Sequence, residues 1–250
     1  MAGDAMGRCA VIRVLDVVVP ARNEEALIGA CLRALLAARA ALRAREPAVR
    51  CRLIVALDSC TDATADVVAA FAPDVEALSL QVGNVGRSRS AAVDLALCGF
   101  DRPREHWICS TDADSAVPET WLLDHLAAAR EGALLALGSV RPRHTDLAPG
   151  AYDDWLARHA TGARHVFGAN LGVRADAYLL AGGFPALRVG EDVALAEAVE
   201  ALDPAFRSAL GVHPDAPVTV SVPHSVVLTS GRLDGRTPGG FAGYLRTLVD

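Results

Sequence analysis

Residues 106–114 read His-Trp-Ile-Cys-Ser-Thr-Asp-Ala-Asp, an apolar run that ends in two carboxylates one residue apart. The run is typical of a buried strand, and the stretch 117–122 that follows is typical of a helix start. Two carboxylates at the carboxyl end of a buried strand are costly unless a cation neutralises them. A hard divalent cation that also binds a diphosphate is the simplest partner. We therefore expect a hard divalent cation at Asp112 and Asp114.

Strands and helices alternate on the amino-terminal side of this stretch. Strands are predicted at 11–19, 52–57, 75–82 and 107–111, and helices from about 25 to 45, from the turn 58–62 to 71, and from the turn 83–86 through 97. This alternation predicts an α/β domain with a mostly parallel sheet. Polar motifs follow the first, second and fourth strands, at the end of the sheet where open α/β sheets bind ligands.

The carboxyl-terminal side alternates less regularly. Strands are predicted at 134–140, 166–173, 218–222 and 225–228, helices at 152–163 and 193–202, and a last helix from Phe241. The three tryptophans at 107, 121 and 155 are expected in the core, with Trp155 also a candidate for the acceptor side.

Composition excludes several classes of protein. The 250 residues carry a net charge of −6, which argues against a nucleic-acid-binding surface. All 24 basic residues are arginine, to which we give little functional weight. None of the six cysteines forms a C-x-x-C pair, so a zinc cluster is not expected and a reducing compartment fits best. We find no signal peptide pattern and no apolar run of membrane-spanning length. We expect a cytoplasmic protein without a transmembrane segment, with peripheral contact at the inner membrane surface left open.

The motifs, in this order, resemble those of glycosyltransferase family 2, the nucleotide-diphospho-sugar transferases with the GT-A fold. They lie at 17–25, 56–62, 84–90, 111–114, 168–174, 182–185 and 190–192. Each motif alone is common, whereas their order and spacing are specific. The resemblance implies a single GT-A domain over 1–250, a Rossmann-like mostly parallel sheet flanked by helices. Its expected parts are a nucleotide-sugar-binding half at 11–115, an acceptor-binding half at 116–228, and a C-terminal loop and helix at 229–250.

The resemblance also implies an activity. A hexose would pass from a UDP- or GDP-linked donor to a hydroxyl on a small-molecule, glycan or lipid-linked acceptor. A single transfer is expected, because the Gln-x-x-Arg-Trp segment and membrane helices of processive members are missing from this sequence. Inverting members use an aspartate at the position of Asp192 as the general base. Some relatives of similar size retain the anomeric configuration, so the stereochemistry stays open.

Donor-binding residues are carried over from the family motifs. They are Pro20, Arg22, Asn23, Glu24, Asp58, Asn84, Arg87, Asp112 and Arg232. Asp58 is expected to accept a hydrogen bond from a ring N–H of the base. Asn23 has an alternative role as the cap of the helix that follows.

Arginines are expected to bind the diphosphate. Arg87 and Arg89 lie near a helix start, a natural anion site, and we favour Arg87. Arg232 and Arg236 are further candidates by charge and position.

The resemblance also implies which residues bind the metal, act as the base and contact the acceptor. Asp114 would ligate the expected cofactor, Mn²⁺ or Mg²⁺, and Asp112 would reach the ribose, the metal or a metal-bound water. His224 would complete the metal ligands unless it is structural. Asp192 is favoured over Glu191 as the base, with helix capping as the alternative role of both. The acceptor would contact Asn170, Gly183 and Phe184.

Two other functions compete with this one. A sugar-1-phosphate nucleotidyltransferase usually has a glycine-rich loop with a basic residue after its first strand, whereas this chain has Pro-Ala-Arg-Asn-Glu at 20–24. A non-catalytic nucleotide-binding protein of the same fold is disfavoured by the intact acidic pairs at 112/114 and 191/192.

Overall fold

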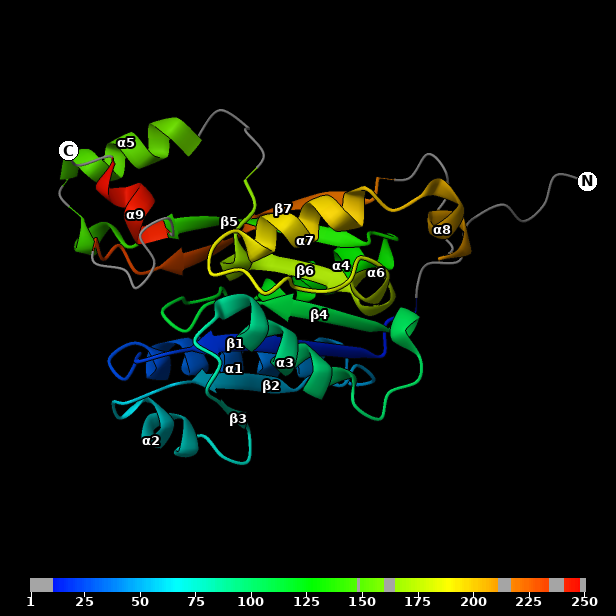
Figure 1. Ribbon diagram of the computed structural model, residues 1–250, viewed down its shortest axis with the longest axis horizontal. Coiled ribbons are helices and arrows are strands. Elements are labelled where there is room, and N and C mark those ends of the chain that lie inside the picture. Colours follow the sequence, from blue (N-terminus) through cyan, green and yellow to red (C-terminus); the bar gives the residue numbers. More distant parts are fainter. Residues whose placement is uncertain (1–10, 148, 160–164, 211–216, 234–240, 248–250) are drawn as a thin grey trace, which may run out of the picture.

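The structure, a computed structural model, describes residues 11–147, 149–159, 165–210, 217–233 and 241–247. A seven-stranded sheet with the order β3-β2-β1-β4-β6-β5-β7 forms its centre (Figure 1). The strands are β1 (Val14–Ala21), β2 (Leu53–Asp58), β3 (Glu76–Leu80), β4 (His106–Ser110), β5 (Leu135–Pro142), β6 (Leu171–Arg174) and β7 (Thr219–Thr229). The α-helices are α1 (Ile28–Arg45), α2 (Thr64–Ala69), α3 (Val85–Leu97), α4 (Trp121–Arg130), α5 (Pro149–His159), α6 (Ala175–Leu180), α7 (Glu191–Glu200), α8 (Pro204–Ala209) and α9 (Phe241–Arg246).

The sheet is parallel except at one strand. β1 pairs in parallel with β2 and β4, and β2 with β3, whereas β6 runs antiparallel to both β4 and β5. The pairing of Ala21 with Leu57 and of Val18 with Ser110 brings the ends of β1, β2 and β4 to one edge. The loops that follow these strands therefore meet at that edge, as the sequence predicts.

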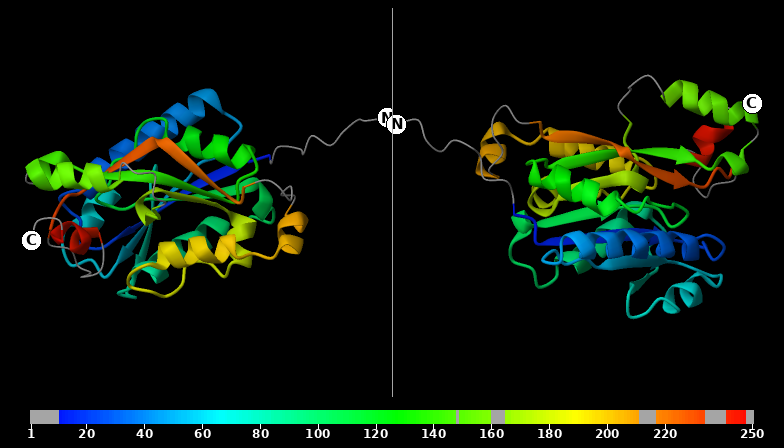
Figure 2. Two further views of the ribbon diagram at one scale, coloured as in Figure 1. Left: turned by 90° about the horizontal axis from the view of Figure 1, so that it is seen from above. Right: turned by 180° about the vertical axis from the view of Figure 1, so that it is seen from behind.

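Helices cover both faces of the sheet (Figure 2). Alternate residues of each strand point to opposite faces, so Val17 packs in the cluster that contains Leu32 of α1, whereas Val18 packs in the cluster that contains Val93 of α3. The first cluster also takes in α4, and the second takes in α6 and α7. Strands buried on both faces read as continuous apolar runs, which explains the valine-rich sequence of β1.

Several strand boundaries differ from the sequence-based expectation. The strand expected at 166–173 begins only at Leu171, because residues 168–170 form a 3₁₀ turn. The strands expected at 218–222 and 225–228 form the one strand β7. Its register against β5 shifts between Gly138 and Val140, where β7 contains Pro223, a residue without an N–H for the ladder.

The first helix and the short helices also differ. α1 begins at Ile28, later than expected, and neither α6 nor α8 was expected from the sequence. Among the described residues, no helix has both the length and the apolar character needed to cross a lipid bilayer.

Candidate active site

A cavity of about 550 Å³ opens where the loops after β1, β2 and β4 meet. Of the residues predicted for the site, its lining includes Pro20, Arg22, Glu24, Asp58, Asn84, Asp112, Asp114, Glu191, Asp192 and Arg232. The other predicted residues that the structure describes lie outside the lining, namely Asn23, Arg87, Asn170, Gly183, Phe184 and His224. Arg236 lies outside the described residues.

The loop after β1 is tied to the loop after β2. Asn23, which has a positive φ of 51°, accepts a hydrogen bond from the Thr61 N–H at 2.8 Å through its Oδ1 and donates to the Thr61 hydroxyl at 3.1 Å. The Glu24 N–H donates to the Thr64 hydroxyl at 2.7 Å. The predicted role of Asn23 as the cap of α1 is therefore wrong, since Leu27 is the N-cap residue. Asn23 instead forms hydrogen bonds to the loop after β2.

Asp58 organises the turn that leads into α3. Its Oδ1 accepts from the N–H groups of Val82 and Gly83 at 2.8 and 2.9 Å, and its Oδ2 accepts from the Asn84 N–H at 2.9 Å and the Ser88 hydroxyl at 3.0 Å. Burial would raise the pKa of Asp58, but these backbone hydrogen bonds outweigh it and hold the pKa below its usual value. Asp58 is thus a charged group in the cavity lining that fixes the turn before α3.

Arg87 and Arg89, near the start of α3, lie in different environments. Asn84 caps α3, because its side chain accepts from the Arg87 N–H at 2.9 Å. Arg87 itself is exposed, whereas Arg89 is buried in the cavity wall. The preference for Arg87 is corrected, since two positions along a helix turn the side chain by about 200°. The apolar spacing of Ala92, Val93 and Ala96 places Arg89 on the buried face, a signal already present in the sequence.

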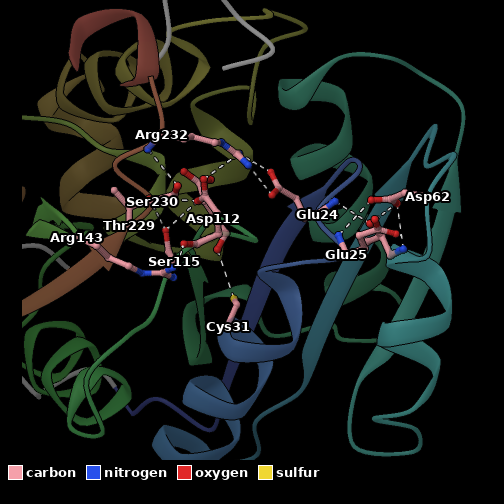
Figure 3. Close-up of polar contacts among 12 residues, drawn as sticks. Glu24, Glu25, Cys31, Asp62, Asp112, Ser115, Arg143, Thr229, Ser230 and Arg232 are labelled. Atoms are coloured by element: carbon pink, nitrogen blue, oxygen red, sulfur yellow. Dashed lines mark hydrogen bonds and ion pairs between the residues drawn. The ribbon is translucent and has the colours of Figure 1, made fainter. Parts of the chain in front are cut away.

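The acidic pair after β4 is held by arginines and hydroxyls (Figure 3). Arg232 makes a two-pronged ion pair with Glu24, at 2.8 and 2.5 Å, and also contacts the Asp114 Oδ2 at 2.9 Å. The other Asp114 oxygen accepts from the Thr229 hydroxyl at 3.2 Å. Asp112 pairs with Arg89. The last segment of β7 and the residues after it thus close over the loop after β4.

The carboxylates fit a hard divalent cation. Asp112 and Asp114 offer oxygen donors, and the Thr229 hydroxyl lies beside them, which is the donor chemistry that Mg²⁺ and Mn²⁺ prefer. Within the described ranges, no group of three or more His, Cys, Asp or Glu side chains converges as a metal site. A cation here would therefore rely on two carboxylates and on substrate phosphates, the usual manner of Mg²⁺ binding.

His224 does not join this group. It lies exposed on β7, five positions before Thr229, and outside the cavity lining. At about 3.3 Å per residue, five positions along a strand span roughly 16 Å. The expectation that His224 completes the metal ligands is corrected for this reason, whereas Thr229 of the same strand does contact Asp114.

Two acids begin α7 in different environments. Glu191 is buried and paired with Arg89, and burial raises its pKa while Arg89 opposes the rise. Asp192 is half-buried and lines the cavity, and its Oδ2 accepts from the Gly168 N–H at 2.6 Å. The less buried Asp192 is therefore the better placed of the two for proton transfer.

The three residues predicted for the acceptor are structural. Asn170 is fully buried, accepts from the Trp121 indole N–H at 2.8 Å and donates to the carbonyls of Ser139 and Ser225 at 2.9 and 2.6 Å. Gly183 has a φ of 74° and packs beneath Tyr178, and Phe184 lies in the core. The acceptor assignment is corrected because Asn170 and Phe184 are buried, and none of the three residues belongs to the cavity lining.

Other residues line the outer end of the cavity. They include Val166, Phe167, Arg188, Val189, Phe241 and Tyr244. Trp155, 1% exposed, packs against Phe241 at a ring distance of 5.1 Å, so it supports this wall from behind. All three tryptophans are buried, which confirms the expectation that they are core residues.

The histidine beside Asn170 predicts a pH dependence of stability. His125 is fully buried, and burial lowers its pKa to about 4, opposed by its contact with Asn170. The unfolded chain binds this proton near pH 6.5, so the contribution is complete above about pH 6.5 and is lost as the pH falls toward 4. Between these pH values, protonation of His125 in the unfolded chain should lower the free energy of unfolding by roughly 1.4 kcal/mol for each pH unit.

Urea unfolding at about pH 7, 5.5 and 4.5 measures this effect. His125→Leu removes the titrating group and should flatten the pH dependence by about one proton. An equal slope in the two proteins would contradict the buried neutral histidine.

The GT-A fold is shared with glycosyltransferases of known structure. S. aureus TarS 1–349 in complex with UDP-GlcNAc matches with a TM-score of 0.59 and 16% identity over 91% of this chain and 61% of that chain. Glucosyl-3-phosphoglycerate synthase from Mycobacterium tuberculosis, in complex with Mn²⁺, UDP and phosphoglyceric acid, matches with a TM-score of 0.53 and 18% identity over 95% and 76% of the two chains. The chain thus spans about 60% of the length of TarS 1–349.

Sequence comparison agrees with the fold. No curated protein matches the chain. The model of the family described as glycosyl transferase family 2 matches residues 16–178, well over half of the chain. The protein therefore belongs to glycosyl transferase family 2.

Proposed function

We propose that the chain is a metal-dependent glycosyltransferase that moves one hexose from a UDP- or GDP-linked donor to a hydroxyl acceptor. The observation that carries this proposal is that the Asp112/Asp114 pair and Asp192 line the same cavity. Family membership and the two similar structures that hold UDP or a UDP-sugar support it. They also make uridine the first base to try.

The donor end offers groups for each part of a nucleotide. Asp58 and the loop after β1 would hold the nucleoside, and Arg232 would meet the diphosphate after leaving Asp114. Divalent metal, when bound at the carboxylates, neutralises charge on the departing diphosphate. The neighbouring synthase that holds Mn²⁺ supports this cofactor.

Asp192 would act as the base of an inverting reaction. Its Oδ2 is held by the Gly168 N–H at 2.6 Å, and its Oδ1 by the Val193 N–H at 2.8 Å. These bonds orient the carboxylate on the wall of the cavity, where it would take the proton from the acceptor hydroxyl during attack on the anomeric carbon. The aromatic and aliphatic outer end would hold the rest of the acceptor.

Thermal unfolding with nucleotide-sugars tests the donor site. A ligand at 100 times its Kd stabilises the native state by about 2.7 kcal/mol. In a chain of this size that corresponds to a Tm rise of roughly 5–10 °C. We expect such a shift with one class of nucleotide-sugar and Mn²⁺ together, and a much smaller one with either alone.

Activity assays on the same purified protein distinguish between the competing functions. Release of pyrophosphate from a nucleoside triphosphate and a sugar-1-phosphate would identify a nucleotidyltransferase. Donor binding without transfer or donor hydrolysis across a broad acceptor panel would identify a non-catalytic binding protein. A folded protein that no donor stabilises would overturn the proposed function.

We further propose that the chain works in the cytoplasm. The described cysteines at 31, 51, 60, 98 and 109 are free thiols. Free thiols are usual in a reducing compartment, which supports this location.

A further inference from the structure

Arg89 lies at the centre of the acidic groups around the cavity. It projects from α3 into the space between the loop after β4 and the first turn of α7, and its side chain is only 3% exposed. One terminal nitrogen pairs with the Asp112 carboxylate and the other with the Glu191 carboxylate. A single buried guanidinium therefore connects an acid of the donor end to the helix that carries Asp192.

The surroundings of Arg89 are shaped for its side chain. A methyl group added to Gly168 would come within 2.4 Å of an Arg89 terminal nitrogen, so the glycine leaves the room that the guanidinium fills. The Phe184 ring lies 5.8 Å from the guanidinium carbon. A planar guanidinium held between a backbone and an aromatic ring is fixed in orientation as well as in position.

Gly168 also connects Arg89 to Asp192. The N–H of Gly168 donates to the Asp192 Oδ2 at 2.6 Å. The residue that makes room for Arg89 thus also orients the carboxylate on the cavity wall. Asp112 and Asp192 are in this way held by one set of contacts that meets at Arg89.

We propose that Arg89 is a positioning residue, which sets the distance and orientation between Asp112 and Asp192 by binding Asp112 and Glu191 at once. The inference rests on the proposed function, because it concerns the geometry of the same transfer. Arg89 itself takes no part in bond making, and its effect passes through the carboxylates that it holds. A displacement of about 1 Å between reacting groups can cost on the order of 100-fold in rate.

The test separates positioning from stability. Arg89→Met removes the charge and leaves Glu191 buried without its partner, so the Tm should fall. Combining Arg89→Met with Glu191→Gln removes that unpaired charge, so most of the lost Tm should return. The kcat of both variants should stay roughly 100-fold below wild type, because Asp112 is released in each. Donor Kd should change by less than about tenfold, since Asp58 and Arg232 remain.

Arg89→Lys tests the geometry of the contact. Lysine keeps the charge but lacks the planar fork that reaches two carboxylates. We expect a Tm close to that of wild type and a kcat that is still reduced by roughly tenfold or more.

A matched control comes from a second buried ion pair. Arg174 pairs with Asp176 at 2.7 Å, both nearly buried, and both lie outside the cavity lining. Arg174→Met should lower the Tm comparably but leave the kcat of the folded enzyme within about twofold of wild type.

Each outcome has one meaning. If the Arg89→Met/Glu191→Gln variant regains wild-type kcat together with its Tm, Arg89 is only structural and the inference is overturned. If the wild-type protein fails to bind any donor with Mn²⁺, the proposed function fails and takes this inference with it. A wild type that binds and transfers, with variants that recover Tm but not kcat, supports positioning by Arg89.

Discussion

Asp114→Ala should abolish metal-dependent turnover, with a loss of roughly 1,000-fold or more, while the protein stays folded. The carboxylate is the only Asp114 group that can neutralise a cation. One of its oxygens contacts Arg232 at 2.9 Å and the other the Thr229 hydroxyl at 3.2 Å. Arg232 has its paired contact with Glu24 independently of Asp114, so we expect the variant to stay folded. Turnover measured across a range of Mn²⁺ concentrations, with Tm measured in parallel, checks this result.

Asp66→Ala is a suitable control for Asp114→Ala. Asp66 is an exposed acid in the first turn of α2 and lies outside the cavity lining. Its removal should leave turnover unchanged. Full activity of Asp114→Ala would contradict the metal role, whereas loss of activity together with a collapsed Tm would place Asp114 among the structural residues.

Asp192→Asn should lower turnover by roughly 100- to 10,000-fold and leave donor binding nearly unchanged. The amide oxygen can still accept from the Gly168 N–H, so the loop before β6 and the start of α7 keep their contact. The amide cannot take a proton from the acceptor, which is the function that the proposal gives to the carboxylate. Measurement of kcat and of donor Kd in the same variant separates the two effects.

The stereochemistry of the product gives an independent check on Asp192. An inverting enzyme changes the anomeric configuration, and NMR of the product reveals it directly. Retention of configuration would contradict a base role for Asp192. Weak donor binding by Asp192→Asn would instead assign the residue to the donor site.

The order of elements and the acidic pair were predictable from local sequence. The valine-rich run of β1 and the apolar run before Asp112 each predict a buried strand, and the structure has β1 at Val14–Ala21 and β4 at His106–Ser110. Boundaries were less predictable where tertiary contacts decide them. The 3₁₀ turn at 168–170 ends at Asn170, which accepts a hydrogen bond from Trp121, and no short-range pattern predicts this partner.

Some site residues were likewise predictable from the sequence, whereas others depended on tertiary contacts. Pro20, Asp58 and Asp112 follow strands whose parallel pairing brings their ends together, so their meeting at one cavity follows from the alternation of strands and helices. Position in a family motif gave wrong site predictions where the burial or exposure of the side chain decides its role. Phe184 lies in a family-like motif, yet it packs in the core, and His224 lies exposed on β7, outside the cavity lining.

The sequence by itself determined the alternation of strands and helices and placed acids at the carboxyl edge of a sheet, since residue period and strand order suffice for that. The order and spacing of its motifs indicated the family. Only the tertiary structure decided which arginine forms an ion pair with which acidic side chain. Arg89 and Glu191 are 102 positions apart, and Arg232 and Glu24 are 208 positions apart. Such pairs form only when helices and loops pack at particular distances, because charge attraction inside a protein depends on separation and burial and carries no trace in local sequence.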